Sequence, residues 1–127
     1  MNSISSNPEY KALSAFLNGK QEHTLLLFDH FIKQFQKVGD IRMEPTKTMI
    51  GISNDHKRIA WVTQLGKNFI HVVFPFKQAY NDNLCFQKVA QVPGDSKQFN
   101  HHFRMLYKED ITAEVIDFMK KAWHEEK

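Results

Sequence analysis

The chain has 127 residues, a length typical of one domain that buries roughly two-thirds of the surface its unfolded form exposes. Its 42% hydrophobic residues, among them 11 Phe and 2 Trp, supply a core and exclude an intrinsically disordered chain. The formal net charge of +3 is small, and the basic residues are spread along the sequence. This balance permits an anionic partner without requiring one.

The single cysteine, Cys85, excludes an intramolecular disulfide and a cysteine-based zinc cage. Residues Met1 to Ser6 are polar and lack the basic and apolar segments of a signal peptide. The longest apolar runs are much shorter than the roughly 20 residues that a membrane span needs. We therefore expect a cytoplasmic protein with no membrane partner.

Two helices are predicted at the start of the chain. The first runs from Pro8 to Leu17, with Asn7 as its cap and Gly19 after its end. The second runs from Glu22 to Val38, because its apolar residues recur at the spacing of a core-facing helix. That stripe consists of Leu25, Phe28, Phe31, Ile32, Phe35 and Val38.

Strand-forming segments with alternating apolar residues follow, separated by turn-forming residues. They predict five strands of an antiparallel meander, over Thr46 to Ser53, Arg58 to Leu65, Phe69 to Phe74, Cys85 to Val92 and Phe99 to Leu106. A last helix is predicted from about Asp110, a good cap, to about Trp123. The fold class is therefore α+β, with two N-terminal helices, a five-stranded meander and a C-terminal helix in one domain over residues 1–127.

A two-residue hairpin turn at Gly66-Lys67 sets the predicted register of the sheet, because it pairs Leu65 with Asn68. Side chains alternate between the two faces of a strand, so this register points Trp61 into the core and Ala60 outward. In the last two strands, the same reasoning places Lys88 and His101 among the apolar side chains of the core face.

The outer face of the predicted sheet carries the candidate site. Gly51 lies inside a strand, where glycine weakens a sheet unless another group approaches closely. With Ala60 and Val73 it forms the small-residue floor of a shallow site. The hydrogen-bond donors predicted around this floor are Lys47, Arg58, His71, His102 and Arg104. Such a set could receive a carboxylate, a phosphate or a nucleic-acid backbone, with Arg104 as a bidentate donor.

The alternative interpretation is a solvated, weakly basic face, covered in part by the first helix or by a second copy of the chain in a homodimer. Most aromatic residues fall on predicted core faces. Only Phe69 is predicted as an exposed aromatic on the basic face, where a binder of single strands would need several.

The remaining chemistry-bearing residues favour structural roles. His101 and His102 are neighbours on a strand, so their side chains point to opposite faces and cannot share one metal. A site assembled from His71, His102 and a carboxylate is conceivable, but no His-Glu-x-x-His motif or two-cysteine zinc spacing accompanies it. Cys85 has no adjacent helix terminus to lower its pKa. No metal or cofactor is therefore expected.

Two segments resemble those of a known family. Residues 44–50, with the sequence EPTKTMI, open the sheet, and His101-His102-Phe103-Arg104 precedes a helix that ends in Ala122-Trp123. Over about Leu25 to Trp123 the chain resembles a bacterial family described as domain of unknown function 5655, some of whose members are labelled predicted transport proteins. Some relatives attach such a domain to parts of restriction-type DNA-processing proteins. The resemblance implies an accessory or binding role and carries no activity.

Three functional hypotheses follow. The first is a non-enzymatic module whose outer face binds an anionic small molecule or an acidic segment of a partner protein. The second is an accessory nucleic-acid-binding domain, whose affinity would fall steeply with salt. The third is a small hydrolase or transferase with His71 or His102 as general base, for which the sequence offers no evident nucleophile or orienting carboxylate.

Overall fold

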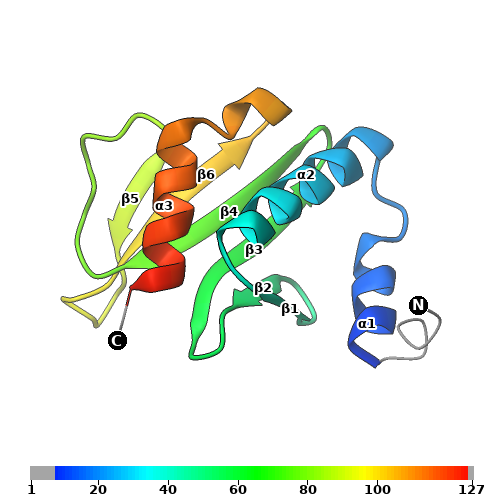
Figure 1. Ribbon diagram of the computed structural model, residues 1–127, viewed down its shortest axis with the longest axis horizontal. Coiled ribbons are helices and arrows are strands. Elements are labelled where there is room, and N and C mark those ends of the chain that lie inside the picture. Colours follow the sequence, from blue (N-terminus) through cyan, green and yellow to red (C-terminus); the bar gives the residue numbers. More distant parts are fainter. Residues whose placement is uncertain (1–7, 126–127) are drawn as a thin grey trace.

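The computed structural model describes residues 8–125, and the chain begins there with helices α1 (Pro8–Leu17) and α2 (Glu22–Val38) (Figure 1). Both helices have the bounds that the sequence predicts. The predicted cap of α1, Asn7, lies outside the described residues. Gly19 follows α1 with φ of 81°, a conformation that glycine adopts without strain.

Most of the predicted apolar stripe of α2 is buried, and the buried face begins one residue earlier than expected, at Thr24. Leu25 and Val38 are only half-buried. The buried residues of α2 are Thr24, Leu27, Phe28, Phe31, Ile32 and Phe35.

The sheet has six antiparallel strands, so the predicted five-stranded meander is wrong in strand number and order. The strand order is β1-β2-β3-β4-β6-β5, because β6 lies between β4 and β5. Residues 77–87 lead from β4 to the far edge of the sheet (Figure 1). The strands are β1 (Arg42–Pro45), β2 (Ile50–Ser53), β3 (Arg58–Gly66), β4 (Phe69–Phe76), β5 (Lys88–Gln91) and β6 (Phe99–Met105).

The segment predicted as the first strand, Thr46 to Ser53, divides into a turn and β2. Thr46 closes the turn, since its hydroxyl oxygen lies 3.0 Å from the backbone nitrogen of Met49, which donates to it, and its own N–H donates to the Met49 carbonyl at 2.7 Å. The side chain thus satisfies backbone groups that a continuous strand would have left to a neighbour. Lys47, predicted on the outer sheet face, lies exposed in this turn instead.

The observed register of β3 differs from the predicted one, because the hairpin turn lies one residue later and the strand contains two β-bulges. Gly66 pairs with Phe69, so the hairpin turn is Lys67-Asn68, with Asn68 at φ of 69°. Asparagine adopts this left-handed conformation more readily than other residues that carry a Cβ. The pairing then shifts by one residue between Val62 and Gln64.

A second shift, against β2, lies between the pairs Ile52–Ala60 and Ser53–Arg58. An extra residue in one strand reverses the faces of the side chains beyond it. Between the two bulges Ala60 and Val62 therefore face the core, fully buried, whereas Trp61 faces outward and is half-buried. The predicted core position of Trp61 and outer position of Ala60 are wrong for this reason.

The C-terminal helix α3 (Ala113–His124) begins later than predicted. Asp110 belongs to a short 3-10 turn, η2 (Lys108–Asp110), and its carboxylate accepts the backbone N–H of Leu106 at 2.7 Å. The cap of α3 is Thr112, whose side chain accepts the N–H of Val115. The sequence thus predicted a cap of the right chemistry at the wrong residue.

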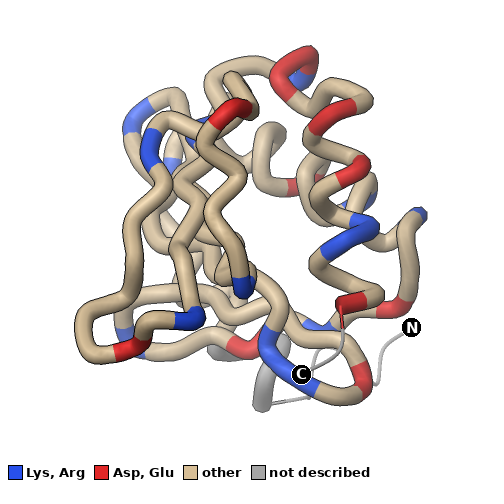
Figure 2. The backbone as a smooth tube through the Cα atoms, turned by 90° about the vertical axis from the view of Figure 1, so that its left-hand side faces the viewer, with Lys and Arg blue, Asp and Glu red and all other residues tan. Residues whose placement is uncertain are grey.

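Helices α2 and α3 contact β3 and β4 on one face of the sheet, and α1 contacts the edge strand β1. The core lies between the two layers, and Figure 2 shows the strands on one side and helical turns on the other. The β4–β5 connection packs on this same face, because Tyr80 and Phe86 lie 5.1 and 4.7 Å from the Phe118 ring. Within the described residues no helix is long and apolar enough to cross a membrane.

Thr24 fastens α2 to the β3–β4 turn, and its replacement tests this junction. Its fully buried hydroxyl donates to the Gly66 carbonyl at 2.7 Å and accepts the Asn68 N–H at 3.1 Å. We expect Thr24→Val, which keeps the shape, to lower the free energy of unfolding by about 1–3 kcal/mol, because two backbone groups lose their partner. Urea unfolding measures this. Thr48→Val, in an exposed turn, is the control, and equal losses in both variants would contradict the prediction.

Candidate functional site

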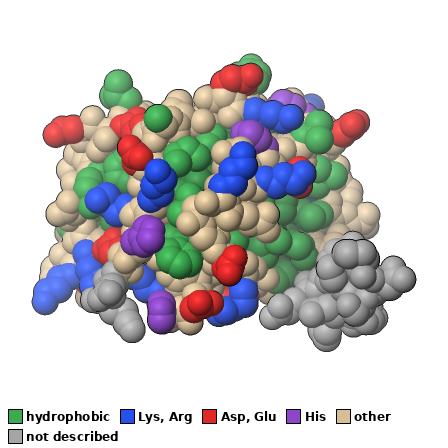
Figure 3. All heavy atoms as spheres, viewed as in Figure 1, with side chains coloured by type: hydrophobic (Ala, Val, Ile, Leu, Met, Phe, Trp, Pro, Cys, Tyr) green, Lys and Arg blue, Asp and Glu red, His purple; other side chains and the backbone are tan. Residues whose placement is uncertain are grey.

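Within residues 8–125, the helices and the connection that pack on the first face leave the second face of the sheet open, and it is called the outer face here. Its side chains come from all six strands. One cross-strand row runs over the sheet from β1 to β5, and it consists of Glu44, Gly51, Trp61, Val73, His102 and Lys88. The opposite, helix-covered face carries intermixed basic and acidic side chains (Figure 3).

At the β1–β3 side of the outer face, Arg58 lies flat on the sheet. Its guanidinium carbon is 4.1 Å from the centroid of the Trp61 ring, and its Nη2 donates to Glu44 Oε1 at 2.8 Å. A Cβ at Gly51 would stand 2.2 Å from Arg58 Nη1, so the guanidinium occupies the space that the glycine leaves. The group that approaches Gly51 closely is therefore the chain's own Arg58.

The carboxylates of Glu44 and Asp55 neutralise the arginines of this half of the outer face, because Glu44 pairs with Arg58 and Arg42, and Arg42 also lies near Asp55. The Ser53 hydroxyl donates to Glu44 Oε1 at 2.8 Å, and Ser53 itself accepts from Arg58 Nε at 2.9 Å. The Ser53 hydrogen bond, with the Arg58 and Arg42 charges, lowers the pKa of Glu44 below its ordinary value. With Ala60 in the core and Gly51 covered, the predicted small-residue floor does not exist.

At the β4–β6 side, two histidines on neighbouring strands form a pair. His71 Nε2 lies 3.0 Å from His102 Nδ1, so one of these nitrogens donates a hydrogen bond to the other. The second ring nitrogen of His71, Nδ1, is buried without a hydrogen-bond partner. Desolvation by burial, followed by the positive charges nearby, lowers the pKa of both histidines. For His71 these charges are His102 and Arg104, and for His102 the charge is Lys88.

Two permanent cations flank the pair. Arg104 is cross-strand partner of His71, and Lys88 is cross-strand partner of His102. Among the described residues, neither cation has a carboxylate within ion-pair distance. We call His71, Lys88, His102 and Arg104 the basic cluster.

Arg104 also covers an aromatic ring. Its guanidinium carbon lies 4.4 Å from the centroid of Phe69. The ring of Phe69 in turn lies against Gly66, where a Cβ would come within 2.2 Å of it. The outer face therefore carries two planar stacks of arginine on an aromatic ring, Arg58 on Trp61 and Arg104 on Phe69.

The structure brings together three of the six candidate residues of the sequence analysis, His71, His102 and Arg104. Arg58 and Gly51 lie on the same face but belong to the neutralised half, and Lys47 lies apart in the β1–β2 turn. Sequence reasoning missed Lys88, assigned to the core face, and Trp61. The signal for Lys88 was its own charge, since a lysine is rarely buried without a partner.

The histidine that was predicted to face the core does so. His101 is fully buried, its Nδ1 lies 3.0 Å from the Phe99 carbonyl, and its Nε2 accepts the Tyr80 N–H at 3.1 Å. Because Nε2 accepts a hydrogen bond, it carries no proton, so Nδ1 carries the ring's one N–H and the ring is neutral. Burial lowers the pKa of His101. This histidine fastens the β4–β5 connection to β6.

The candidate nucleophile Cys85 is inert. It precedes β5, and burial together with the Glu114 carboxylate raises the pKa of its thiol to about 12. A thiolate, the reactive form, is therefore absent near neutral pH. Among the described residues, no three His, Cys, Asp or Glu side chains are arranged to hold a metal ion.

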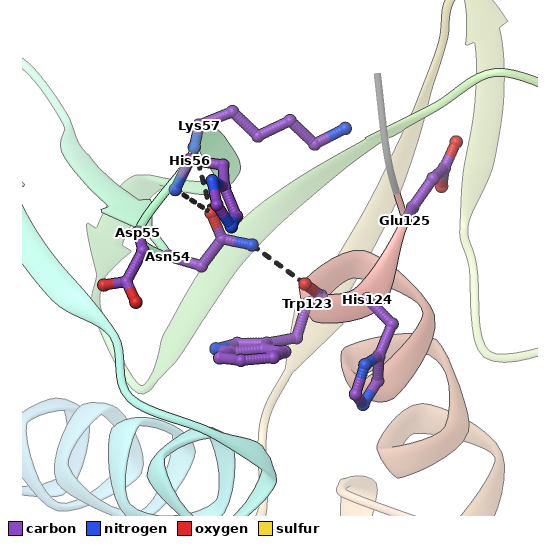
Figure 4. Close-up of a pocket in the computed structure, with 7 residues that line it drawn as sticks. All are labelled: Asn54, Asp55, His56, Lys57, Trp123, His124 and Glu125. Atoms are coloured by element: carbon purple, nitrogen blue, oxygen red, sulfur yellow. Dashed lines mark hydrogen bonds between the residues drawn. The ribbon is translucent and has the colours of Figure 1, made fainter.

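A cleft of about 460 Å³ opens between the β2–β3 turn and the end of α3 (Figure 4). Asn54 spans it, donating to the Trp123 carbonyl at 2.8 Å and accepting the N–H groups of His56 and Lys57. Its amide oxygen thus closes the turn, and its amide nitrogen joins the turn to the helix. Charges of both signs line the cleft, including Asp55, and they favour no particular ligand.

Comparison with known proteins adds one finding. The family model described as "Domain of unknown function (DUF5655)" matches residues 13–125. No curated protein and no solved structure matches the chain.

The lowered pKa values of three histidines predict that the stability of the protein depends on pH. His71, His101 and His102 hold protons less readily in the folded chain than at the ordinary histidine value of 6.5. Below about pH 6.5 the unfolded chain therefore binds more protons, and protonation favours unfolding. We expect the free energy of unfolding to fall between about pH 7 and about pH 5, by at most about 1.4 kcal/mol per pH unit for each group.

Urea unfolding at several pH values measures this dependence. His102→Gln should flatten it, whereas His56→Gln, in an exposed turn, controls for the loss of one histidine and should keep it. A stability that stays constant or rises on acidification would contradict the assignment.

Proposed function

We propose that the protein is a binding module for anionic, phosphate-like ligands. The chain belongs to the DUF5655 family, whose description names no activity. The basic cluster on the open outer face is the binding site. The observation that carries the proposal is that its permanent cations, Lys88 and Arg104, flank a histidine pair with no acidic partner in the described part of the chain.

Electrostatics support an anionic ligand. Positive groups gathered without counter-charges attract anions and raise their local concentration. Arg104 offers a planar fork of donors that matches a phosphate or carboxylate, and Lys88 supplies a point charge. Arg58 on the same face is satisfied by Glu44 and supplies no such charge. The ligand's phosphate groups therefore lie over β4, β6 and β5.

The histidine pair makes this binding depend on pH. Neutral His71 and His102 share one hydrogen bond, so one proton can be added to the pair without breaking it, but a second sets two N–H groups against each other. A bound anion favours the protonated pair. Affinity should therefore rise as the pH falls toward 6.5 and below, while the neighbouring charges of Lys88 and Arg104 oppose protonation of the free protein.

Binding is favoured over catalysis by the chemistry of the neighbourhood. A histidine general base needs a nucleophile or substrate proton within hydrogen-bond reach and commonly a carboxylate that orients it. The partner of His71 is a second histidine, and Cys85 is a thiol with a raised pKa. We therefore assign the pair to ligand binding.

Inorganic pyrophosphate, titrated at low salt and followed by backbone amide NMR, tests the proposal. We expect shifts at β4 and β6, tighter binding at about pH 6 than at about pH 8, and a roughly tenfold loss of affinity in Arg104→Gln, because hydrogen bonds to charged groups contribute about 1.5–3 kcal/mol.

The matched control is Lys120→Gln, which removes the same unit of charge from an exposed position on α3. Equal weakening by both variants would mean that net charge alone attracts the anion. No saturable binding by the wild-type chain at low salt would refute the proposal.

A further inference from the structure

We infer that the ligand of the outer face is a single-stranded nucleic acid, whose phosphates meet the basic cluster and whose bases stack on the guanidinium planes of Arg58 and Arg104, each of which lies over an aromatic ring. The inference rests on the proposed function and names its substrate class. It draws on planar groups that a small anion would not need.

The first support is the pair of planar stacks. Arg58 lies 4.1 Å over the Trp61 ring, and Arg104 lies 4.4 Å over the Phe69 ring. Unpaired bases stack on aromatic side chains and on guanidinium planes, which is how sheet surfaces hold single-stranded RNA and DNA. Gly51 and Gly66 leave the room for these groups to lie against the sheet.

The second support is the spacing of these groups. Trp61 pairs with Val73, which is four residues from Phe69 along β4. At about 3.3 Å per residue and about 4.8 Å between strands, the Cα atoms of Trp61 and Phe69 are roughly 14 Å apart. A single nucleotide base cannot touch both, but successive nucleotides of one strand can.

The third support is the charge between the two stacks. His71 lies between Phe69 and Val73 along β4, and Arg104 and His102 lie beside them on β6. A backbone whose bases stack at either end thus passes over the basic cluster. Glu44, the acidic side chain of this face, is occupied by Ser53 and Arg58 at the far side. The charge pattern and the stacks therefore fit the same strand.

An open sheet face also favours single strands over duplex DNA. Bases inside a duplex stack on one another and present only their edges in the grooves. The outer face is flat and does not enter a groove, so its arginine and aromatic side chains cannot stack on those bases. A duplex could meet the cations through its phosphates alone. We therefore expect a single strand to bind more tightly than the duplex of the same sequence.

The test uses a fluorescein-labelled oligothymidine of about a dozen nucleotides and its duplex, followed by anisotropy against the full chain. Base stacking contributes about 1–3 kcal/mol per base, so Trp61→Leu and Phe69→Leu should each weaken single-strand binding about tenfold. Trp61→Leu, which removes a ring that contacts Arg58 and no residue of the basic cluster, should leave pyrophosphate binding within about twofold. Leucine keeps apolar bulk, and thermal unfolding confirms that each variant is folded.

Salt dependence gives a second, independent readout. If three phosphates are neutralised, the logarithm of the binding constant should fall with the logarithm of salt concentration at a slope of about −2. Arg104→Gln should reduce this slope by about 0.7. Tyr107→Leu, which removes an exposed aromatic side chain outside the outer face, is the control and should change neither affinity nor slope.

The outcomes separate the two proposals. Oligonucleotide binding that is lost in the Leu variants while pyrophosphate still binds supports the inference. Pyrophosphate binding without oligonucleotide binding, or oligonucleotide binding unaffected by the Leu variants, overturns the inference and leaves the proposed function. Equal or tighter binding of the duplex, or a dimer by light scattering that dissociates in Trp61→Leu, also overturns it. If neither ligand binds, both proposals fail.

Discussion

The character of the outer face depends on two single-residue bulges in β3. Between them, Ala60 and Val62 face the core and Trp61 faces out, with the Arg58 guanidinium stacked on its ring. With one bulge alone, every side chain from the bulge to the end of the strand would point to the opposite face of the sheet. The second bulge returns the side chains beyond it to the faces that simple alternation predicts. Leu65 and Arg58, outside the bulged segment, therefore keep the sides that simple alternation assigns to them.

The limits of sequence reasoning follow from what is local and what is not. The caps and periodicity of α1 and α2 are properties of neighbouring residues, and the bounds predicted from them are right. The position of a bulge depends on how β3 pairs with both of its neighbouring strands. The residues near Thr63 give no local signal that predicts it. The edge strand β1 is only four residues long and ends in Pro45, and the place of β6 beside β4 depends on residues far apart in sequence.

The same distinction explains which candidate residues come together. His71, His102 and Arg104 lie on β4 and β6, which pair without a bulge over seven residues, so alternation alone predicts their common face. Gly51 was correctly seen as a place of close approach, but the approaching group, Arg58, could be identified only from the folded sheet. Lys88 was missed because its face is set by the pairing of β5 with β6.

The two halves of the outer face differ in whether their positive charges are balanced by a carboxylate. Arg58 is matched by a carboxylate and a hydroxyl, an arrangement that needs no ligand. In the basic cluster, burial, followed by the neighbouring positive charges, lowers the pKa values of the histidines, and a ring nitrogen of His71 is left without a partner. Groups so perturbed gather at functional sites more often than elsewhere. An anion over the cluster would relieve the repulsion and restore protons to the pair, so ligand binding and proton uptake are linked there by the same charges.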